Sequence, residues 1–193
     1  MRQAATYAGL AVLAAIWLLP LQLWLGWVFP VHMLRHMALV AIAAPLLAIG
    51  LGARMPWLTI SPLLASALEF AVVWLWHLPT LHGIAYLHLP GYVLEQAGFL
   101  AVGLLVWVSA LRPGEALTGA GGLLVTSMHM TLLGALLILA PRDLFAAICG
   151  LAPDLGQQQI GGLLMLGIGT PVYLIGGLIL VHGVLEGGEE QGV

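Results

Sequence analysis

Long apolar stretches constrain the fold of this chain more than any other feature of its sequence. A helix that crosses a bilayer needs about 20 mostly apolar residues, and each stretch comes close to this length or exceeds it. Helices can span lipid because they satisfy their backbone polar groups internally. We therefore predict an all-α, polytopic membrane bundle of about six transmembrane helices that forms one integral membrane domain over residues 1–193. The predicted spans are 5–28, 32–52, 60–78, 91–111, 118–140 and 158–182.

The composition agrees with a chain that is solvated by lipid. Only 7% of the residues are charged and 62% are hydrophobic, whereas soluble domains carry about 25% charged residues. The net charge of -3 offers no basic patch, so we expect membrane lipid around the chain and no nucleic acid as a partner. Cys149 is the one cysteine, which excludes a disulfide within the chain.

The arginines predict the orientation of the bundle. With this set of spans, Arg2, Arg54 and Arg112 fall on the side of the N-terminus, and Arg142 falls on the opposite side. Basic residues in short loops favour the cytoplasmic side. We therefore expect both termini in the cytoplasm, with the loops 79–90 and 141–157 outside.

The first apolar stretch invites comparison with a signal peptide. It runs over residues 4–29, longer than the roughly 7–15 apolar residues of a signal-peptide core. We expect a membrane anchor, kinked at Pro20, because neighbouring helices can accommodate proline inside a bilayer.

Histidines gather towards one predicted face of the membrane. His32 and His36 open the second span at the external side, and His77 closes the third span at the same side. His82 and His88 follow in the external loop. Two histidines lie elsewhere, namely His129 near the middle of the fifth span and His182 at the cytoplasmic end.

A histidine–methionine pattern indicates metal chemistry. A spacing of four places His32 and His36 on one helical face, with methionines beside both. Imidazole binds several transition metals, and thioether favours Cu(I). The alternative is a purely structural role, with histidines at the membrane interface and methionines that fill gaps in the core. The candidate ligands are His32, His36, His77, His129, Met33, Met37, Met128 and Met165.

Two carboxylates extend this candidate site. Glu69 lies roughly 13 Å below the external edge at 1.5 Å per residue, where an ionisable group must face the bundle interior. We expect it close to His129, and neutral unless a metal ion or an arginine lies beside it. Glu95 lies one turn into the fourth span and either faces inwards or reaches the headgroups.

Four segments of the sequence resemble the CtaG family of cytochrome c oxidase assembly factors. They are HMLRHMALVAIAAPLLAIG (32–50), VVWLWHLP (72–79), VLEQAGFLAVGLLVW (93–107) and QQQIGGLLM (157–165). The resemblance implies a multi-pass protein of the bacterial inner (plasma) membrane that matures haem–copper oxidases by helping copper reach them. It implies oxidase subunits or other assembly factors as partners. His32, His36 and His77 match histidines of the family.

Two positions depart from the family pattern. The family usually has Glu-His where this chain has Glu95-Gln96, and it usually has an acidic residue where this chain has Gln157-Gln158-Gln159. If those positions bind metal in relatives, this chain binds it with fewer or different ligands.

Three functions fit these features. The first is a non-enzymatic assembly factor that handles Cu(I) at an externally open His/Met site. The second is a membrane cytochrome with haem b held by two of His36, His77 and His129, with Arg35 near a propionate. The third is a structural scaffold subunit of an oxidase. The chain carries no sequence motif of hydrolytic or phosphoryl-transfer enzymes.

Overall fold

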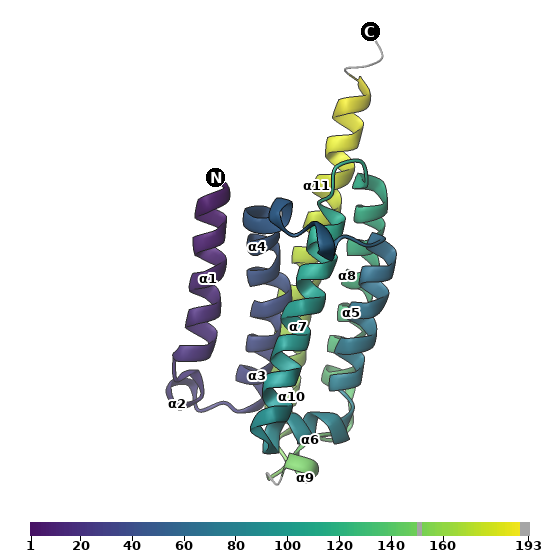
Figure 1. Ribbon diagram of the computed structural model, residues 1–193. Coiled ribbons are helices and arrows are strands. Elements are labelled where there is room, and N and C mark those ends of the chain that lie inside the picture. Colours follow the sequence, from purple (N-terminus) through teal and green to yellow (C-terminus); the bar gives the residue numbers. More distant parts are fainter. Residues whose placement is uncertain (150–151, 190–193) are drawn as a thin grey trace.

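A computed structural model describes residues 1–149 and 152–189 of the chain as a bundle of roughly aligned helices (Figure 1). No strand occurs within these residues, which confirms the all-α prediction. Two columns of the bundle are each interrupted by a π-helix, labelled η1 in one and η4 in the other. The long elements are α1 (Arg2–Leu18), α3 (Phe29–Met37), η1 (Ala38–Ala43), α4 (Ala44–Leu51), α5 (Pro62–Trp76), α7 (Leu89–Ala110), α8 (Ala116–Leu139), α10 (Leu155–Leu164), η4 (Met165–Gly169) and α11 (Thr170–Glu189).

Short helices close the two ends of the bundle. At one end, here called the α6 end, lie α2 (Leu21–Leu25), α6 (Pro79–Leu87) and α9 (Ala146–Cys149) (Figure 1). At the other, the terminal end, lie the short helices η2 (Gly52–Arg54) and η3 (Pro56–Leu58). The start of α1 and the end of α11 lie at the terminal end as well. The two loops predicted to share one side therefore do so, because α6 and α9 contact each other.

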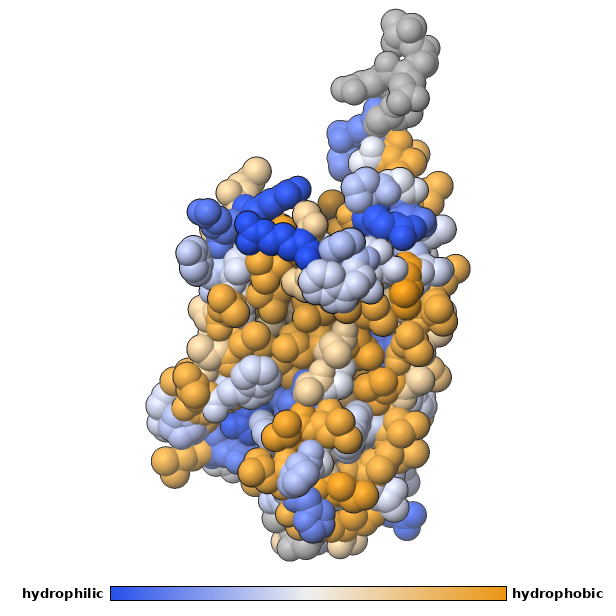
Figure 2. Space-filling model, viewed as in Figure 1, coloured by the Kyte–Doolittle hydropathy of each residue, from blue (hydrophilic) through white to orange (hydrophobic). Residues whose placement is uncertain are grey.

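The helices make this a multi-pass membrane protein. In the described part of the chain, 4 helices are long and apolar enough to span a bilayer, or up to 5 if α5 and α6 form one span bent by 74°. The predicted count of six is therefore not confirmed. Figure 2 shows a broad hydrophobic band around the middle of one face, with hydrophilic surface gathered towards both ends.

Proline ends the first helix early, so the span predicted over 5–28 is broken at Pro20 and not only kinked there. The residue before a proline is held away from the helical conformation, and Leu19 is extended (φ -79°, ψ 138°) in front of Pro20. The 17 residues of α1 cover about 26 Å at 1.5 Å per residue, which is less than the roughly 30 Å of a bilayer core. The chain then turns through α2 before α3 begins.

The same effect separates α5 from α6. Leu78 is extended (φ -65°, ψ 130°) in front of Pro79, which takes a first-turn position of α6. That position suits proline because its missing N–H would have no helical partner there. As a result α6 lies across the end of the bundle, so part of the predicted external loop is a helix that covers this end.

Each π-helix precedes a proline. Pro45 follows η1 by two residues, and Pro171 follows η4 by two residues. A proline inside a helix lacks the N–H for its carbonyl partner and clashes with the preceding turn. A widened turn accommodates both effects. The columns α3–η1–α4 and α10–η4–α11 therefore continue past their prolines.

The core lies between these two columns and α7 and α8. It includes four fully buried methionines and the fully buried Tyr173. Helices α8 and α10 approach closely at Gly134 and Gly162, where a Cβ on Gly134 would lie 2.9 Å from the Gly162 carbonyl oxygen. Small residues allow such backbone contact in membranes, where apolar surface gives no drive between helices.

Candidate metal site

Helix α3 supplies two histidines to the bundle interior. His32 and His36 lie one turn apart and are 6% and 0% exposed. The predicted shared helical face is therefore confirmed. The side chain of Met33 and the sulfur of Met37 lie instead near Gly161 and Gly169, which places both methionines against the α10–η4 column.

Helix α6 brings His82 to His32. The centroids of the two imidazole rings are 4.8 Å apart, and the rings meet edge to face. Phe29 and Phe145 pack beside the His82 ring at centroid distances of 5.6 and 4.6 Å. His82 is 3% exposed, although the sequence suggested only a loop position for it.

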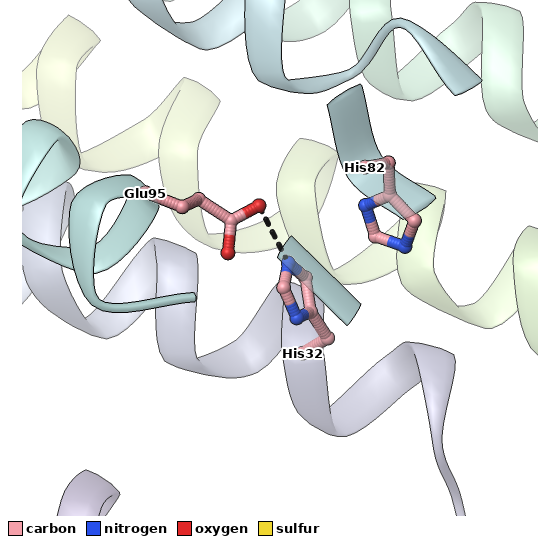
Figure 3. A group of neighbouring side chains, drawn as sticks. All are labelled: His32, His82 and Glu95. Atoms are coloured by element: carbon pink, nitrogen blue, oxygen red, sulfur yellow. Dashed lines mark hydrogen bonds and ion pairs between the residues drawn. The ribbon is translucent and has the colours of Figure 1, made fainter. Parts of the chain in front are cut away.

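Glu95 of α7 completes the group. One of its carboxylate oxygens lies 3.1 Å from His32 Nε2, and the other accepts a hydrogen bond of 3.3 Å from the Gln96 amide. Glu95 is 1% exposed, so the inward alternative for this residue is confirmed. Figure 3 shows the three side chains converging from three helices.

This His32–His82–Glu95 cluster can hold a metal ion. One ligand atom from each residue lies within 4.8 Å of the other two. Donor atoms of a tetrahedral ion are about 3.3–3.6 Å apart when each lies about 2.0–2.2 Å from the metal. Small side-chain rotations would therefore close the group around an ion. Two imidazoles and a carboxylate suit several divalent transition metals.

A pair of imidazoles lies next to this cluster, one turn further along α3. The His36 and His77 rings are 5.2 Å apart, and Phe99 stacks on His36 at 3.8 Å. His77 Nδ1 donates to the Val73 carbonyl at 2.7 Å, which directs Nε2 away from its own helix. Among the described residues, His77 Nε2 and both His36 nitrogens have no hydrogen-bond partner.

Unsatisfied buried nitrogens at this pair need a physical explanation. Buried polar atoms nearly always have a partner, since an unmade hydrogen bond costs about 1–3 kcal/mol. A ligand, a metal ion or a water molecule would supply the missing partner. The His36–His77 pair is therefore a second place where a ligand, a metal ion or a water molecule could bind.

Two cavities reach the cluster from the α6 end. One, of about 460 Å³, is lined by residues that include His32, Arg35 and His88. The other, of about 280 Å³, is lined by His82 together with Phe145, Cys149 and neighbouring residues. An ion or a partner could therefore approach His32 and His82 by separate routes.

The loop that covers His82 is held by two aspartates. Asp143 accepts hydrogen bonds from the backbone N–H groups of Phe145 and Ala146, at 2.9 and 3.0 Å. Asp154 caps the start of α10 by accepting from the Gln157 backbone N–H. Hydrogen bonds from the side chain and backbone of Gln157 hold the pKa of Asp154 below its ordinary value.

The glutamines that depart from the family pattern bond to the protein itself. Gln157 accepts from the Val28 backbone N–H at 3.0 Å. Gln158 accepts from the Leu144 N–H at 2.7 Å and donates to the Leu137 carbonyl. These contacts join α10 to Val28, to the 141–149 segment and to α8, so the glutamines act as structural links here.

Glu69 lies apart from the His32–His82–Glu95 cluster. It is fully buried on α5, as the prediction of an inward-facing carboxyl requires. Its oxygens lie 2.6 Å from the Tyr173 hydroxyl and 3.1 Å from the Thr126 hydroxyl. Within residues 1–149 and 152–189 its hydrogen bonds go to these two hydroxyl groups and not to His129.

The other predicted ligands lie outside the cluster. His129 is buried on α8 against Phe70, at a centroid distance of 5.4 Å. Met128 is 64% exposed, which directs it away from the core, and Met165 is fully buried at the start of η4. His182 forms an exposed ion pair with Glu186 near the C-terminal end of α11.

His82 is the site residue that the sequence analysis did not include among the ligands. Its signal was present but weak: Pro79 opens a helix as readily as it ends one, and His82 lies three residues after it. A short helix starting at Pro79 would have directed one face of 79–87 to the bundle.

Comparison with known protein families gives one match. Residues 52–186 match the family described as cytochrome c oxidase caa3 assembly factor (Caa3_CtaG). The match covers more than half of the chain and confirms the resemblance; it begins after His32 and His36. Comparison with curated proteins and with solved structures gives no match.

Proposed function

Since the chain belongs to the cytochrome c oxidase caa3 assembly factor family, we propose that it binds a copper ion in the membrane for a haem–copper oxidase. Family membership implies a non-catalytic role. The proposed ligands are His32, His82 and Glu95, with His36 and His77 as a second pair one turn deeper. The proposed location is the bacterial inner membrane, with oxidase subunits or other assembly factors as partners.

One observation carries this proposal: three buried metal-binding side chains from α3, α6 and α7 meet within 4.8 Å. His32 and Glu95 already pair at 3.1 Å, and His82 brings a third donor beside them, as a bound ion would require. The neighbouring His36 and His77 nitrogens without hydrogen-bond partners among the described residues strengthen the argument. A pair of imidazoles buried only for packing would be expected to find backbone or side-chain partners.

Copper is favoured by the combination of the family and the donor set. Copper is a metal of the oxidases that such factors mature, and imidazole binds it well. Methionine would favour Cu(I) further, but Met33 and Met37 pack against the α10–η4 column. In this proposal the primary ligands are therefore the imidazoles of His32 and His82 and the carboxylate of Glu95. Met33 and Met37 stay candidate ligands for an ion that moves further into the bundle.

For the His36–His77 pair, the haem alternative receives less support from the geometry. A porphyrin held by two histidines must lie between their rings. The His36 and His77 rings are 5.2 Å apart, and Phe99 covers one face of His36. The scaffold alternative would not explain why both ring nitrogens of His36 and Nε2 of His77 are buried without hydrogen-bond partners among the described residues.

The test compares two histidines from neighbouring positions. His82 is buried in the cluster, whereas His88 is exposed at the mouth of one cavity. The purified protein should bind one copper ion tightly, His82→Ala should weaken binding by more than about 10-fold, as loss of even an outer-shell group does, and His88→Ala should not. Equal copper affinity in His82→Ala and the parent would reject the site. A Soret band in the purified parent would favour the cytochrome instead.

A further inference from the structure

The carbonyl of Val40 lacks the donors that an α-helix would give it. In an α-helix the N–H of Ala44 would donate to it. In η1 the Ala44 N–H donates to the Leu39 carbonyl instead. The next residue is Pro45, which has no N–H to offer. The Val40 carbonyl therefore loses both of its helical donors at a fully buried position.

Two side chains from other helices take their place. Trp107 Nε1 of α7 donates to the Val40 oxygen at 3.1 Å, and the Tyr173 hydroxyl of α11 lies 3.0 Å from the same oxygen. The Trp107 and Tyr173 rings stack with centroids 5.2 Å apart. The widened turn is thus held by α7 and α11.

Glu69 continues this network into α5 and α8. Its carboxyl lies 2.6 Å from the Tyr173 hydroxyl and 3.1 Å from the Thr126 hydroxyl. The Tyr173 hydroxyl has one hydrogen, yet it lies within bonding distance of two oxygens. Only if Glu69 carries a proton can Glu69 donate to Tyr173 while Tyr173 donates to Val40.

The charge balance agrees with a neutral carboxyl. None of the ion pairs in the described part of the chain includes Glu69. A buried carboxylate without a cation is costly, whereas a neutral acid with an acceptor and a donor is fully hydrogen-bonded. In its neutral form, Glu69 joins α5 and α8 to α11 and the widened turn.

The widened turn also sets the direction of α3. An added residue in one turn rotates the part of the helix before it by about 100° relative to the part after it, because an α-helix has 3.6 residues per turn. His36 lies four residues before Val40, and His32 lies eight residues before it. The register of η1 therefore decides whether both histidines face α6 and α7.

We infer that Glu69 is a protonated positioning residue, which acts through Tyr173 and the Val40 carbonyl to hold the turn that aims His32 and His36. The inference rests on the proposed function for its copper readout. Its chemistry differs from that of Glu95, which lies in the cluster as a candidate ligand. Glu69 never contacts the ion and contributes by fixing a backbone register.

The test uses the full chain in lipid nanodiscs with matched variants of one network. Glu69→Gln keeps a donor for Tyr173 and an acceptor for Thr126, and it should bind copper like the parent. Glu69→Leu and Tyr173→Phe should weaken copper binding by about 10–100-fold, as loss of outer-shell support does. Thr126→Val, which removes only a donor to Glu69, should have the smaller effect.

Infrared spectroscopy adds a readout that a purely structural role would not change. The parent should show the carbonyl-stretch band of a protonated carboxylic acid, and Glu69→Gln should lose that band. Absence of this band from the parent, or unchanged copper affinity in Glu69→Leu, would overturn the inference.

Failure of the proposed function can be told apart from failure of this inference. If the parent bound no copper, the infrared band would still test whether Glu69 is protonated. Amide hydrogen exchange over residues 29–43 would still test whether Glu69 holds the widened turn. Faster exchange of this segment in Glu69→Leu than in Glu69→Gln supports the positioning role. Equal protection in the two variants would overturn it.

Discussion

The His32–His82–Glu95 cluster and the Glu69–Tyr173–Val40 network are both buried and polar, yet their hydrogen bonding differs. In the network each oxygen meets a protein partner, at 2.6–3.1 Å. Beside the cluster, His36 and His77 carry nitrogens that meet none among the described residues. The difference teaches that burial alone does not indicate a binding site, whereas buried ligand nitrogens without hydrogen-bond partners mark candidates for one.

The largest expected effect separates binding from folding at the cluster. His32→Gln keeps a hydrogen-bond donor for Glu95 but replaces imidazole by a poorer copper ligand. We expect copper affinity to fall by more than about 100-fold, beyond the 10–100-fold typical of outer-shell changes, with little change in the unfolding midpoint. The affinity is measured by competition with a copper chelator. The control is His182→Gln, whose exposed site at the other end of the bundle should leave copper binding unchanged.

In the Glu69–Tyr173–Val40 network, by contrast, a single change should lower the stability of the fold. Trp107→Phe removes the N–H that donates to the Val40 carbonyl while keeping an aromatic ring. The Val40 carbonyl then keeps only the Tyr173 hydroxyl as a donor. A typical hydrogen bond contributes about 0.5–1.5 kcal/mol to stability, so the free energy of unfolding should fall by about that amount. Reversible unfolding in mixed micelles measures it, with the exposed Trp57→Phe as control. Equal stabilities of the two variants would remove the network from the account of the fold.

A third change probes the nitrogens that lack partners. His36→Leu removes two buried nitrogens without hydrogen-bond partners in the described structure, and an apolar replacement of such a group is neutral or stabilising. The free energy of unfolding should stay constant or rise by about 1 kcal/mol, while copper affinity falls by about 10-fold. Marked destabilisation by His36→Leu would mean that His36 is a structural histidine, contrary to its proposed role.

The smallest effect concerns the cap that fastens the loop over His82. The lowered pKa of Asp154 means that its ionised form stabilises the start of α10. This contribution is present above the carboxyl's unfolded-state pKa and is lost as the pH falls through its lower folded-state pKa. Amide hydrogen exchange at the start of α10 should therefore quicken at acidic pH in the parent. Asp154→Asn, which keeps an acceptor but has no charge, should show no such dependence.

The sequence predicted more of the fold than of the site. The length of the apolar stretches predicted an all-α fold. The spacing of His32 and His36 predicted that both face inwards from one helix. Both predictions succeeded because they depend on local properties of the sequence. The missed features arise from prolines. Pro20 ends α1 at Leu18, and Pro79 turns the expected loop into α6, which carries His82.

The contacts of Glu69 illustrate what local patterns leave out. Depth within the span predicted correctly that the carboxyl faces inwards. Its partner, however, is Tyr173, which lies 104 residues further along the chain. The packing of α11 against the core decides that pairing, and no periodicity in the sequence of α5 contains it. The orientation of the bundle in the membrane stays a prediction from the arginines.

X-ray absorption spectroscopy of the copper-loaded protein tests the central claim most directly, because it identifies the atoms bound to copper. The account predicts a shell of nitrogen and oxygen atoms with the scattering pattern of imidazole. Replacing Glu95 by Gln should change that shell while the imidazole pattern stays. A shell dominated by methionine sulfur, or one unchanged in both His32→Gln and His82→Ala, would contradict a copper site at His32, His82 and Glu95.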